Sequence, residues 1–257
     1  MNVDYHTHST YSDGRFLWSM CRAAESAELE AIGIADHCNV SSREKQVAAK
    51  KALGFNLDAT YERRRDAIET MNDRFDVRVY DAVEMDFDSR DADAIAEFLA
   101  DAAFEYAIGS VHHLEDVNIH IEPYFASKSD SEREALVEQF FEEAVALLES
   151  ELFEIAAHVD LIERNPALRG FATDEQYHAV AAAAAESRTV VEINAGRALG
   201  EYGEFHPTPR FLEILGEYGV EFVLGTDSHT PDEVRNRVDA LEKFALTHGI
   251  DPVELDV

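Results

Sequence analysis

Short apolar segments alternate with longer amphipathic segments along the whole chain, and this pattern limits the possible folds more than any other feature of the sequence. The short segments are rich in Val, Ile, Phe and Tyr, which is typical of strands, whereas the longer ones are rich in Ala and Glu. Strands that alternate with helices form βα units and a mostly parallel sheet. The sequence therefore predicts an α/β fold.

Seven segments have the composition and length of strands, and seven others have a helical period. The expected strands are residues 2–6, 31–35, 77–83, 106–110, 153–157, 189–193 and 221–225. The expected helices are residues 17–29, 61–75, 91–102, 131–148, 174–186, 208–218 and 231–247. Residues 39–60 have no clear period, and we expect them to form a loop with some helix that covers a site.

Two helices carry recognisable start signals. Ser131 and Glu134 have the spacing of a capping box. Thr208 is a suitable N-terminal cap for a helix with Pro209 in its first position. These signals predict where the two helices begin.

The charge balance is strongly acidic, with 53 Asp and Glu against 22 Lys and Arg and a formal net charge of −31. Such a surface disfavours nucleic acid and anionic membranes, which need clustered positive charge. A folded chain of this composition suggests adaptation to high salt, such as a halophilic origin, because molar salt shortens repulsion between carboxylates to about 3 Å.

The length of 257 residues suits a single domain covering residues 1–257. No stretch reaches the length of a membrane helix and no signal peptide is apparent, so we expect a cytoplasmic location. The two cysteines, Cys21 and Cys38, are expected to be free thiols. The sequence does not indicate an oligomeric state.

Metal-binding and acid–base residues follow every expected strand. Six of the 11 histidines lie at or just after a strand end. Because the carboxyl ends of parallel barrel strands share one face, these residues would converge on one cavity. The strand ends carry His6-Thr7-His8, Asp36-His37, Glu84-Met85-Asp86, Ser110-Val111-His112-His113, His158-Val159-Asp160, Glu192-Ile193-Asn194 and Asp227-Ser228-His229.

Local spacing strengthens the case for metal binding. In an extended segment residues two apart point the same way, so His6 and His8 would project together, as would Asp227 and His229 if their turn stays extended. Imidazole and carboxylate ligands suit Zn, Mn or Fe. The set is too rich for one ion, and two or three ions bridged by a carboxylate are typical of phosphate-ester hydrolysis.

The ordered motifs resemble those of the PHP (polymerase and histidinol phosphatase) superfamily over essentially the whole chain. They are Asp4–His8 with Ser12-Asp13-Gly14, Ala35–His37, Val83–Asp86, Gly109–His112, Ala157–Asp160 and Gly225–His229. Within it, Asp160-Leu161-Ile162-x-Arg164, Glu192–Asn194 and Pro207–Pro209 are most similar to the histidinol-phosphate phosphatases. The resemblance implies a distorted (β/α)7 TIM-like barrel.

The resemblance also implies a trinuclear metal site. One ion would be held by His6, His8, Glu84 and Asp227; Glu84 would bridge to a second, held by His112 and His158; Asp13, His37 and His229 would hold the third. Asp13 departs from the histidine usual in histidinol phosphatases, and it could instead belong to a Ser-Asp-Gly turn. Asp86 is the alternative to Glu84 as the bridge.

In the expected reaction, hydroxide on the metal attacks phosphorus in line with the leaving alkoxide. Glu84, His112, Asp227 and His229 are the expected catalytic residues. Arg164 and Arg197 are candidates for binding the phosphate oxygens, with a surface cap and a solvated loop charge as their alternatives.

Four functions compete. The first is hydrolysis of a small phosphate ester, L-histidinol phosphate, and the second is hydrolysis of a nucleotide, nucleoside bisphosphate or phosphodiester, which Asp13 favours. The third is a non-catalytic metal-binding domain, which the complete ligand set disfavours. The fourth is a zinc amidohydrolase, which usually needs a bridging lysine; none of the five lysines follows an expected core strand.

Overall fold

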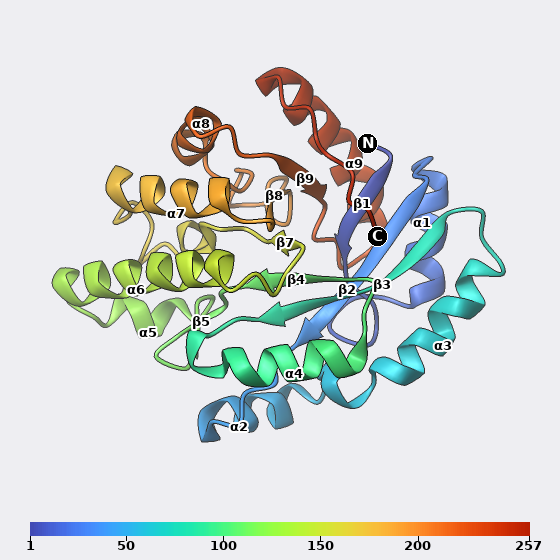
Figure 1. Ribbon diagram of the computed structural model, residues 1–257, viewed down its shortest axis with the longest axis horizontal. Coiled ribbons are helices and arrows are strands. Elements are labelled where there is room, and N and C mark those ends of the chain that lie inside the picture. Colours follow the sequence, from blue (N-terminus) through green and yellow to red (C-terminus); the bar gives the residue numbers. More distant parts are fainter.

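The computed structural model describes residues 1–257 and contains a seven-stranded parallel sheet whose strands pair in the order β1-β2-β3-β4-β7-β8-β9 (Figure 1). Each strand therefore pairs with the next parallel strand along the chain, as in successive βα units. The strands are β1 (Val3–Thr7), β2 (Ala31–Cys38), β3 (Arg78–Asp86), β4 (Tyr106–Ser110), β7 (Ile155–Ala156), β8 (Val190–Asn194) and β9 (Phe222–Gly225).

The sheet is curved into a nearly closed barrel. Thr7 at the end of β1 forms a parallel bridge with Ser228, which follows β9. The amide of His8 donates to the carbonyl oxygen of Ser228 at 2.9 Å. These contacts join the first and last strands at their carboxyl ends, and they confirm the expected seven-stranded α/β barrel.

Helices surround the barrel, as Figure 1 shows. They are α1 (Leu17–Ser26), α2 (Glu44–Leu53), α3 (Tyr61–Asn72), α4 (Ala92–Ala102), α5 (Glu122–Ala126), α6 (Asp130–Glu149), α7 (Asp174–Glu186), α8 (Pro209–Glu217) and α9 (Pro231–His248). Short 3₁₀ helices span Leu57–Ala59, Ser89–Asp91 and Leu161–Arg164, and a two-stranded hairpin joins β5 (His113–Leu114) to β6 (Val117–Asn118). None of the helices combines the length and apolarity needed to cross a membrane.

All seven expected strands and seven expected helices are present, with ends that differ by a few residues. The strand expected at 153–157 keeps only Ile155–Ala156, because the chain pairs with its neighbours over just these residues. Residues 39–60 contain α2 and the turn Leu57–Ala59, in agreement with a loop that includes some helix.

The capping box expected at Ser131 and Glu134 is wrong by two residues. The helix α6 begins at Asp130, and Ser129 and Glu132 form the box. The amide and hydroxyl of Ser129 donate to Glu132 Oε2 at 2.8 and 2.7 Å. The same Ser-x-x-Glu spacing occurs twice in overlap here, and the earlier pair is the one used. The prediction for Thr208 is correct in position, since α8 begins at Pro209.

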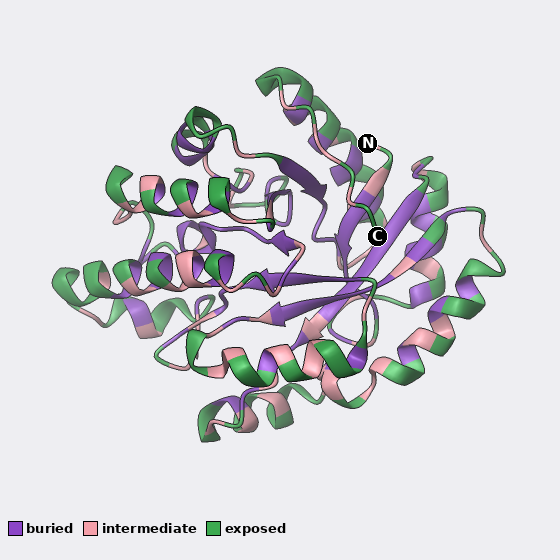
Figure 2. Cartoon of the chain, viewed as in Figure 1, coloured by how far each residue is buried: buried purple, intermediate pink, exposed green.

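Apolar side chains fill both the barrel and the layer beneath the helices. Figure 2 shows that the strands are mostly buried, whereas the helices carry both buried and exposed residues. A cluster inside the barrel includes Tyr5, Tyr106, Ile108, Ile155 and Val223. Two further clusters lie between the strands and the helices, one under α1, α3 and the first half of α9, and a larger one under α4 to α8 and the second half of α9. The polar strand ends are therefore supported from below and from the sides by packed core.

The barrel interior leaves no room for a side chain at Gly33 in β2. The Tyr106 hydroxyl donates to the carbonyl oxygen of Tyr5 at 2.6 Å. A Cβ on Gly33 would lie 1.6 Å from the Tyr106 hydroxyl and 2.8 Å from the Tyr5 carbonyl oxygen. Glycine at this position lets Tyr106 reach across the interior.

We predict that Gly33→Ala lowers the free energy of unfolding by about 3 kcal/mol, because Tyr106 must leave its hydrogen bond and the interior is overpacked. The measurement is urea denaturation of the wild type and the variant. Gly216→Ala in α8 is the matched control, since a Cβ there meets nothing within 4 Å. Equal stability of Gly33→Ala and the wild type would contradict this account of the interior.

Candidate metal centre

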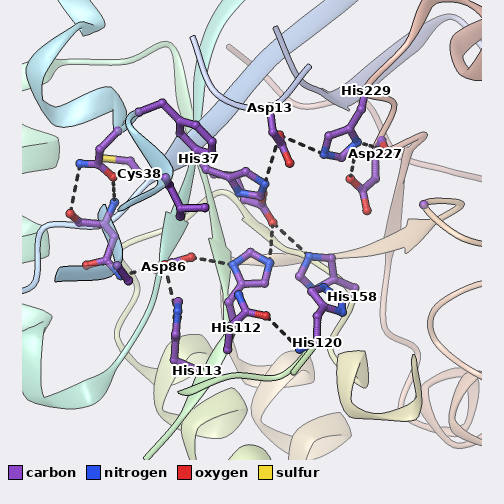
Figure 3. Close-up of a pocket in the computed structure, with 18 of the residues that line it drawn as sticks. Asp13, His37, Cys38, Asp86, His112, His113, His120, His158, Asp227 and His229 are labelled. Carbon is purple, nitrogen blue, oxygen red and sulfur yellow. Dashed lines mark hydrogen bonds and ion pairs between the residues drawn. The ribbon is translucent and has the colours of Figure 1, made fainter. Parts of the chain in front are cut away.

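The expected metal ligands meet at the carboxyl end of the barrel (Figure 3). His6 lies in β1, His37 in β2 and Glu84 in β3, while the other ligands follow the ends of their strands. All of them except His6 and His8, which are fully buried, line a cavity of about 380 Å³, and residues 39–56 form one of its walls. The segment expected to cover a site therefore contributes to the wall of this one.

Glu84 lies at the centre of the cluster and is almost fully buried. The histidine nitrogens nearest to its carboxylate belong to His6 (3.4 Å), His8 (3.6 Å), His37 (2.7 Å), His112 (3.4 Å) and His158 (3.0 Å). Burial opposes ionisation, but the charges of His37, His6 and His112 outweigh it and hold the pKa of Glu84 well below its ordinary value. The structure thus places Glu84, rather than Asp86, where five rings converge.

Most of these separations match the spacing of ligands around one ion. Ligand atoms at about 2.1 Å from a tetrahedral ion lie about 3.4 Å apart. His6 Nε2 and His112 Nε2 are 3.4 Å from Glu84 oxygens, and His8 Nε2 is 3.4 Å from Asp227 Oδ1. The donor atoms are therefore spaced to share ions as well as to contact one another.

Three atoms at the centre have no hydrogen-bond partner although they are buried: His6 Nε2, His8 Nε2 and Glu84 Oε2. Burying such atoms without a partner costs about 1 to 3 kcal/mol each. A bound cation would satisfy all three at once. This observation, together with the ligand chemistry, shows that the residues fit a divalent metal.

The donor atoms form three groups that could each hold an ion. They are His6, His8 and Asp227; His37, Glu84 and His112; and His8, Asp13, His37 and His229. The third agrees with the expected third metal set, with His8 added. The first contains three of the four residues expected and lacks Glu84, one oxygen of which lies 3.4 Å from His6 Nε2. In the second, His37 takes the place expected for His158, whose Nε2 nevertheless lies 3.0 Å from Glu84.

Asp13 faces the metal cluster. Its Oδ1 lies 3.2 Å from His229 Nε2 and 3.7 Å from His37 Nε2. Burial opposes ionisation of Asp13, but the hydrogen bond from His229 and the charge of His37 lower its pKa. The Ser-Asp-Gly turn therefore presents a carboxylate to two histidines.

Buried Asp36 holds the Asp13 loop in place. It accepts hydrogen bonds from the amide and hydroxyl of Ser9 at 2.7 Å and from the hydroxyl of Ser12 at 2.6 Å. Its charge is balanced by fully buried Arg64 at 3.1 Å. The loop that carries Asp13 is thereby fixed to β2 and α3.

Two ligands sit on strained backbone. His158 and Asp227 have φ values of 30° and 50°, a region that non-glycine residues rarely adopt. The turn at Asp227 is therefore not extended, so the condition under which Asp227 and His229 would project together is not met, yet His229 Nδ1 lies 3.7 Å from Asp227 Oδ1. Arg237 donates to the carbonyl oxygens of Thr226 and Asp227 at 3.1 and 2.7 Å and so stabilises this turn.

Outer carboxylates orient two of the rings, and their roles were not anticipated. His6 Nδ1 contacts Glu192 Oε1 at 2.8 Å, and His112 Nδ1 contacts Asp86 Oδ1 at 2.6 Å. Each contact directs the opposite ring nitrogen toward Glu84, as outer partners of metal-binding histidines commonly do. A signal was present in the sequence, because both acidic residues lie within apolar strands.

The two candidate phosphate-binding arginines both line the cavity. Arg164 is nearly buried and bonded to three neighbours, whereas Arg197 is exposed at the mouth. His120 is exposed and also lines the cavity, because the turn after β6 brings it over the strand ends. His113 lies 3.4 Å from Asp86 Oδ2, behind the main cluster.

Comparison with known proteins agrees with this geometry, since residues 4–196 match the PHP domain family. The chain belongs to the PHP family. Asp227 and His229 lie beyond the matched residues, and the barrel brings them to the same cluster. A probable histidinol-phosphatase of Deinococcus radiodurans is 27% identical over 179 residues, which span 68% of this chain and 66% of that protein.

Two solved structures share the PHP fold. Histidinol phosphate phosphatase from Lactococcus lactis, complexed with zinc, L-histidinol and phosphate, has a TM-score of 0.74 at 20% identity, covering 98% of this chain and 95% of its own. A putative histidinol phosphatase from Listeria monocytogenes has a TM-score of 0.73 at 17% identity, covering 90% of this chain and 96% of its own. These likenesses confirm the barrel.

We predict that Glu84→Gln loses most of its bound metal, because the neutral amide cannot balance charge at the point where five histidines converge. The measurement is metal analysis after dialysis of protein loaded with Mn²⁺ or Zn²⁺. Glu69→Gln, an exposed change on α3, is the control and should retain metal like the wild type. Full metal content in Glu84→Gln would show that Glu84 is not a ligand.

Proposed function

We propose that this PHP protein is a metal-dependent phosphomonoesterase that hydrolyses L-histidinol phosphate to L-histidinol and phosphate. The observation that carries the proposal is the convergence of five histidines on Glu84 beside a cavity lined by Arg164 and Arg197. Such an arrangement combines a multinuclear metal site with cationic groups for an anionic ester. The zinc, L-histidinol and phosphate in the Lactococcus structure support the same substrate.

The proposed ion sets are those that the family resemblance implies, and each shares residues with one of the three donor groups. His6, His8, Glu84 and Asp227 would hold one ion, Glu84 with His112 and His158 a second, and Asp13, His37 and His229 a third. His37 also lies close enough to Glu84 to contribute to the second set. Divalent ions bound here would supply an activated water and neutralise phosphate oxygens. Zn, Mn and Fe all accept these ligands.

The chain itself supplies orientation and charge. Glu192 and Asp86 fix the rings of His6 and His112, so that Nε2 of each ring faces Glu84. Arg164 and Arg197 would bind the non-bridging oxygens of the ester. Residues 39–56 form one wall of the cavity in which the ester would bind. Glu84, His112, Asp227 and His229 are the proposed catalytic residues.

A second candidate keeps this chemistry but changes the substrate to a nucleotide or nucleoside bisphosphate. Asp13 favours it, because the Ser-Asp-Gly motif resembles other PHP phosphoesterases and the structure places Asp13 beside His229 and His37.

A single-domain organisation and a cytoplasmic location remain predictions from the sequence.

The deciding experiment measures phosphate release with Mn²⁺ in molar KCl from L-histidinol phosphate, a nucleoside monophosphate and a 3′,5′-bisphosphate. We expect selective turnover of L-histidinol phosphate by the wild type and by Glu69→Gln, and loss of turnover in Glu84→Gln. Selective turnover of a nucleotide would establish the second candidate. No turnover of any ester by fully metal-loaded protein would contradict both.

We also propose that the protein is adapted to high salt, on the basis of its net charge of −31. Mutual repulsion of surface carboxylates should destabilise the fold in dilute buffer and weaken as salt screens it. Thermal unfolding should therefore shift to higher temperature between 0.1 and 2 M KCl. A melting temperature independent of salt would refute the adaptation.

A further inference from the structure

A buried chain of three side chains lies behind the phosphate-binding side of the cavity. It runs from Asp160 through His206 to Arg164. Asp160 and His206 are fully buried, and 7% of the Arg164 side chain is exposed. His206 lies in the segment before α8. Its backbone forms an antiparallel β-bridge with Asn194 at the end of β8. None of the metal groups includes His206.

The contacts specify the tautomer of His206. Its Nδ1 lies 2.5 Å from Asp160 Oδ1, and its Nε2 lies 2.8 Å from Arg164 Nε. A guanidinium nitrogen only donates, so Nε2 must offer a lone pair and the ring proton must lie on Nδ1. Asp160 is held in turn by the amide of Thr208, which donates to its Oδ2 at 2.7 Å. The ring of Tyr202 stacks on the imidazole ring of His206, with the two ring centroids 5.0 Å apart.

The same geometry leaves one nitrogen of Arg164 for a ligand. Its Nε donates to His206, and its Nη2 donates to Asn194 Oδ1 at 2.8 Å and to Asp227 Oδ2 at 3.3 Å. No protein acceptor contacts Nη1, and Arg164 lines the cavity. The two N–H groups of Nη1 are therefore the pair that remains for a phosphate oxygen.

We propose that His206 is a positioning residue that orients Arg164 for phosphate through a neutral, Nδ1-protonated imidazole anchored by Asp160. The inference rests on the proposed function only in naming phosphate as the ligand of Arg164. The positioning depends on the lone pair of His206 Nε2. If residue 206 fills the same space but offers no acceptor to Arg164 Nε, the guanidinium is no longer held. Arg164 then turns away from the cavity, and phosphate loses a charge-assisted contact.

The first test reads the tautomer in zinc-loaded wild-type protein by long-range ¹H–¹⁵N NMR, with the His206 signals assigned from their absence in His206→Asn. We expect the Nδ1-protonated neutral form from pH 6 to 8. An Nε2-protonated ring or an imidazolium would overturn the proposal, because neither can accept a proton from Arg164 Nε. This readout does not depend on catalysis.

The second test measures binding of inorganic phosphate to zinc-loaded variants by calorimetry. His206→Asn keeps a donor for Asp160 but loses the acceptor, and we expect it to weaken phosphate binding about 10- to 100-fold, the range of a hydrogen bond to a charged group. His206→Gln restores an acceptor near Nε2 and should bind phosphate more tightly than the Asn variant. His248→Asn, on the exposed end of α9, is the control and should bind like the wild type.

A double mutant separates positioning from a general structural effect. If His206 acts through Arg164, then Arg164→Met with His206→Asn should bind phosphate no more weakly than Arg164→Met alone. Additive losses, or wild-type binding by His206→Asn, would overturn the proposal. Phosphate binding that follows the expected order in a protein without esterase activity would contradict the proposed function and support this inference.

Discussion

The buried carboxylate of Glu84 is the interaction on which the rest of the structure depends. Five histidines reach it from strands separated by as many as 152 residues, so the charge at Glu84 holds the carboxyl ends of the barrel strands together. A lone buried carboxylate is too costly to keep without partners. The histidine rings around Glu84, and the cations that they would bind, provide those partners. The barrel's closure, with β1 beside the segment after β9, is what brings His6, His8 and Asp227 to the same point.

Around this centre lies an outer layer of buried polar contacts that limits how the ligands can move. Glu192 joins two parts of the site, because its Oε1 contacts His6 and its Oε2 accepts from Asn194 at 2.9 Å. Asn194 in turn accepts from Arg164 at 2.8 Å. The metal-facing histidine and the phosphate-facing arginine thus share one hydrogen-bonded network, in which each polar atom is oriented before a ligand arrives. Strained backbone at Asp227 is tolerated because Arg237 binds the carbonyl oxygens on either side of it.

The sequence predicted the seven strands and the residues that cluster at their ends, because both follow from local patterns: apolar runs set the strands, and a parallel barrel places their carboxyl ends on one face. What it could not predict depends on contacts between distant segments. The outer partners Glu192 and Asp86 are acidic residues in apolar strands, but only the barrel's register shows which histidine each one faces. The contacts of His206 could not be predicted either, since its partners lie 46 and 42 residues away in the sequence. The capping box moved by two residues because two overlapping pairs satisfy the same local rule.

The acidic surface of the protein repels an anionic ester, whereas the arginines that line the cavity attract it. A chain with a net charge of −31 repels a phosphate ester at long range in dilute solution. In molar salt the screening length is about 3 Å, so an approaching ester responds only to the groups it touches. Those groups include Arg164, Arg197 and Arg237 in the cavity wall, drawn from only 22 basic residues in the whole chain. A small set of cations, of which Arg164 and Arg237 are held by hydrogen bonds, is then sufficient for recognition, because the field of the remaining surface does not reach the ligand.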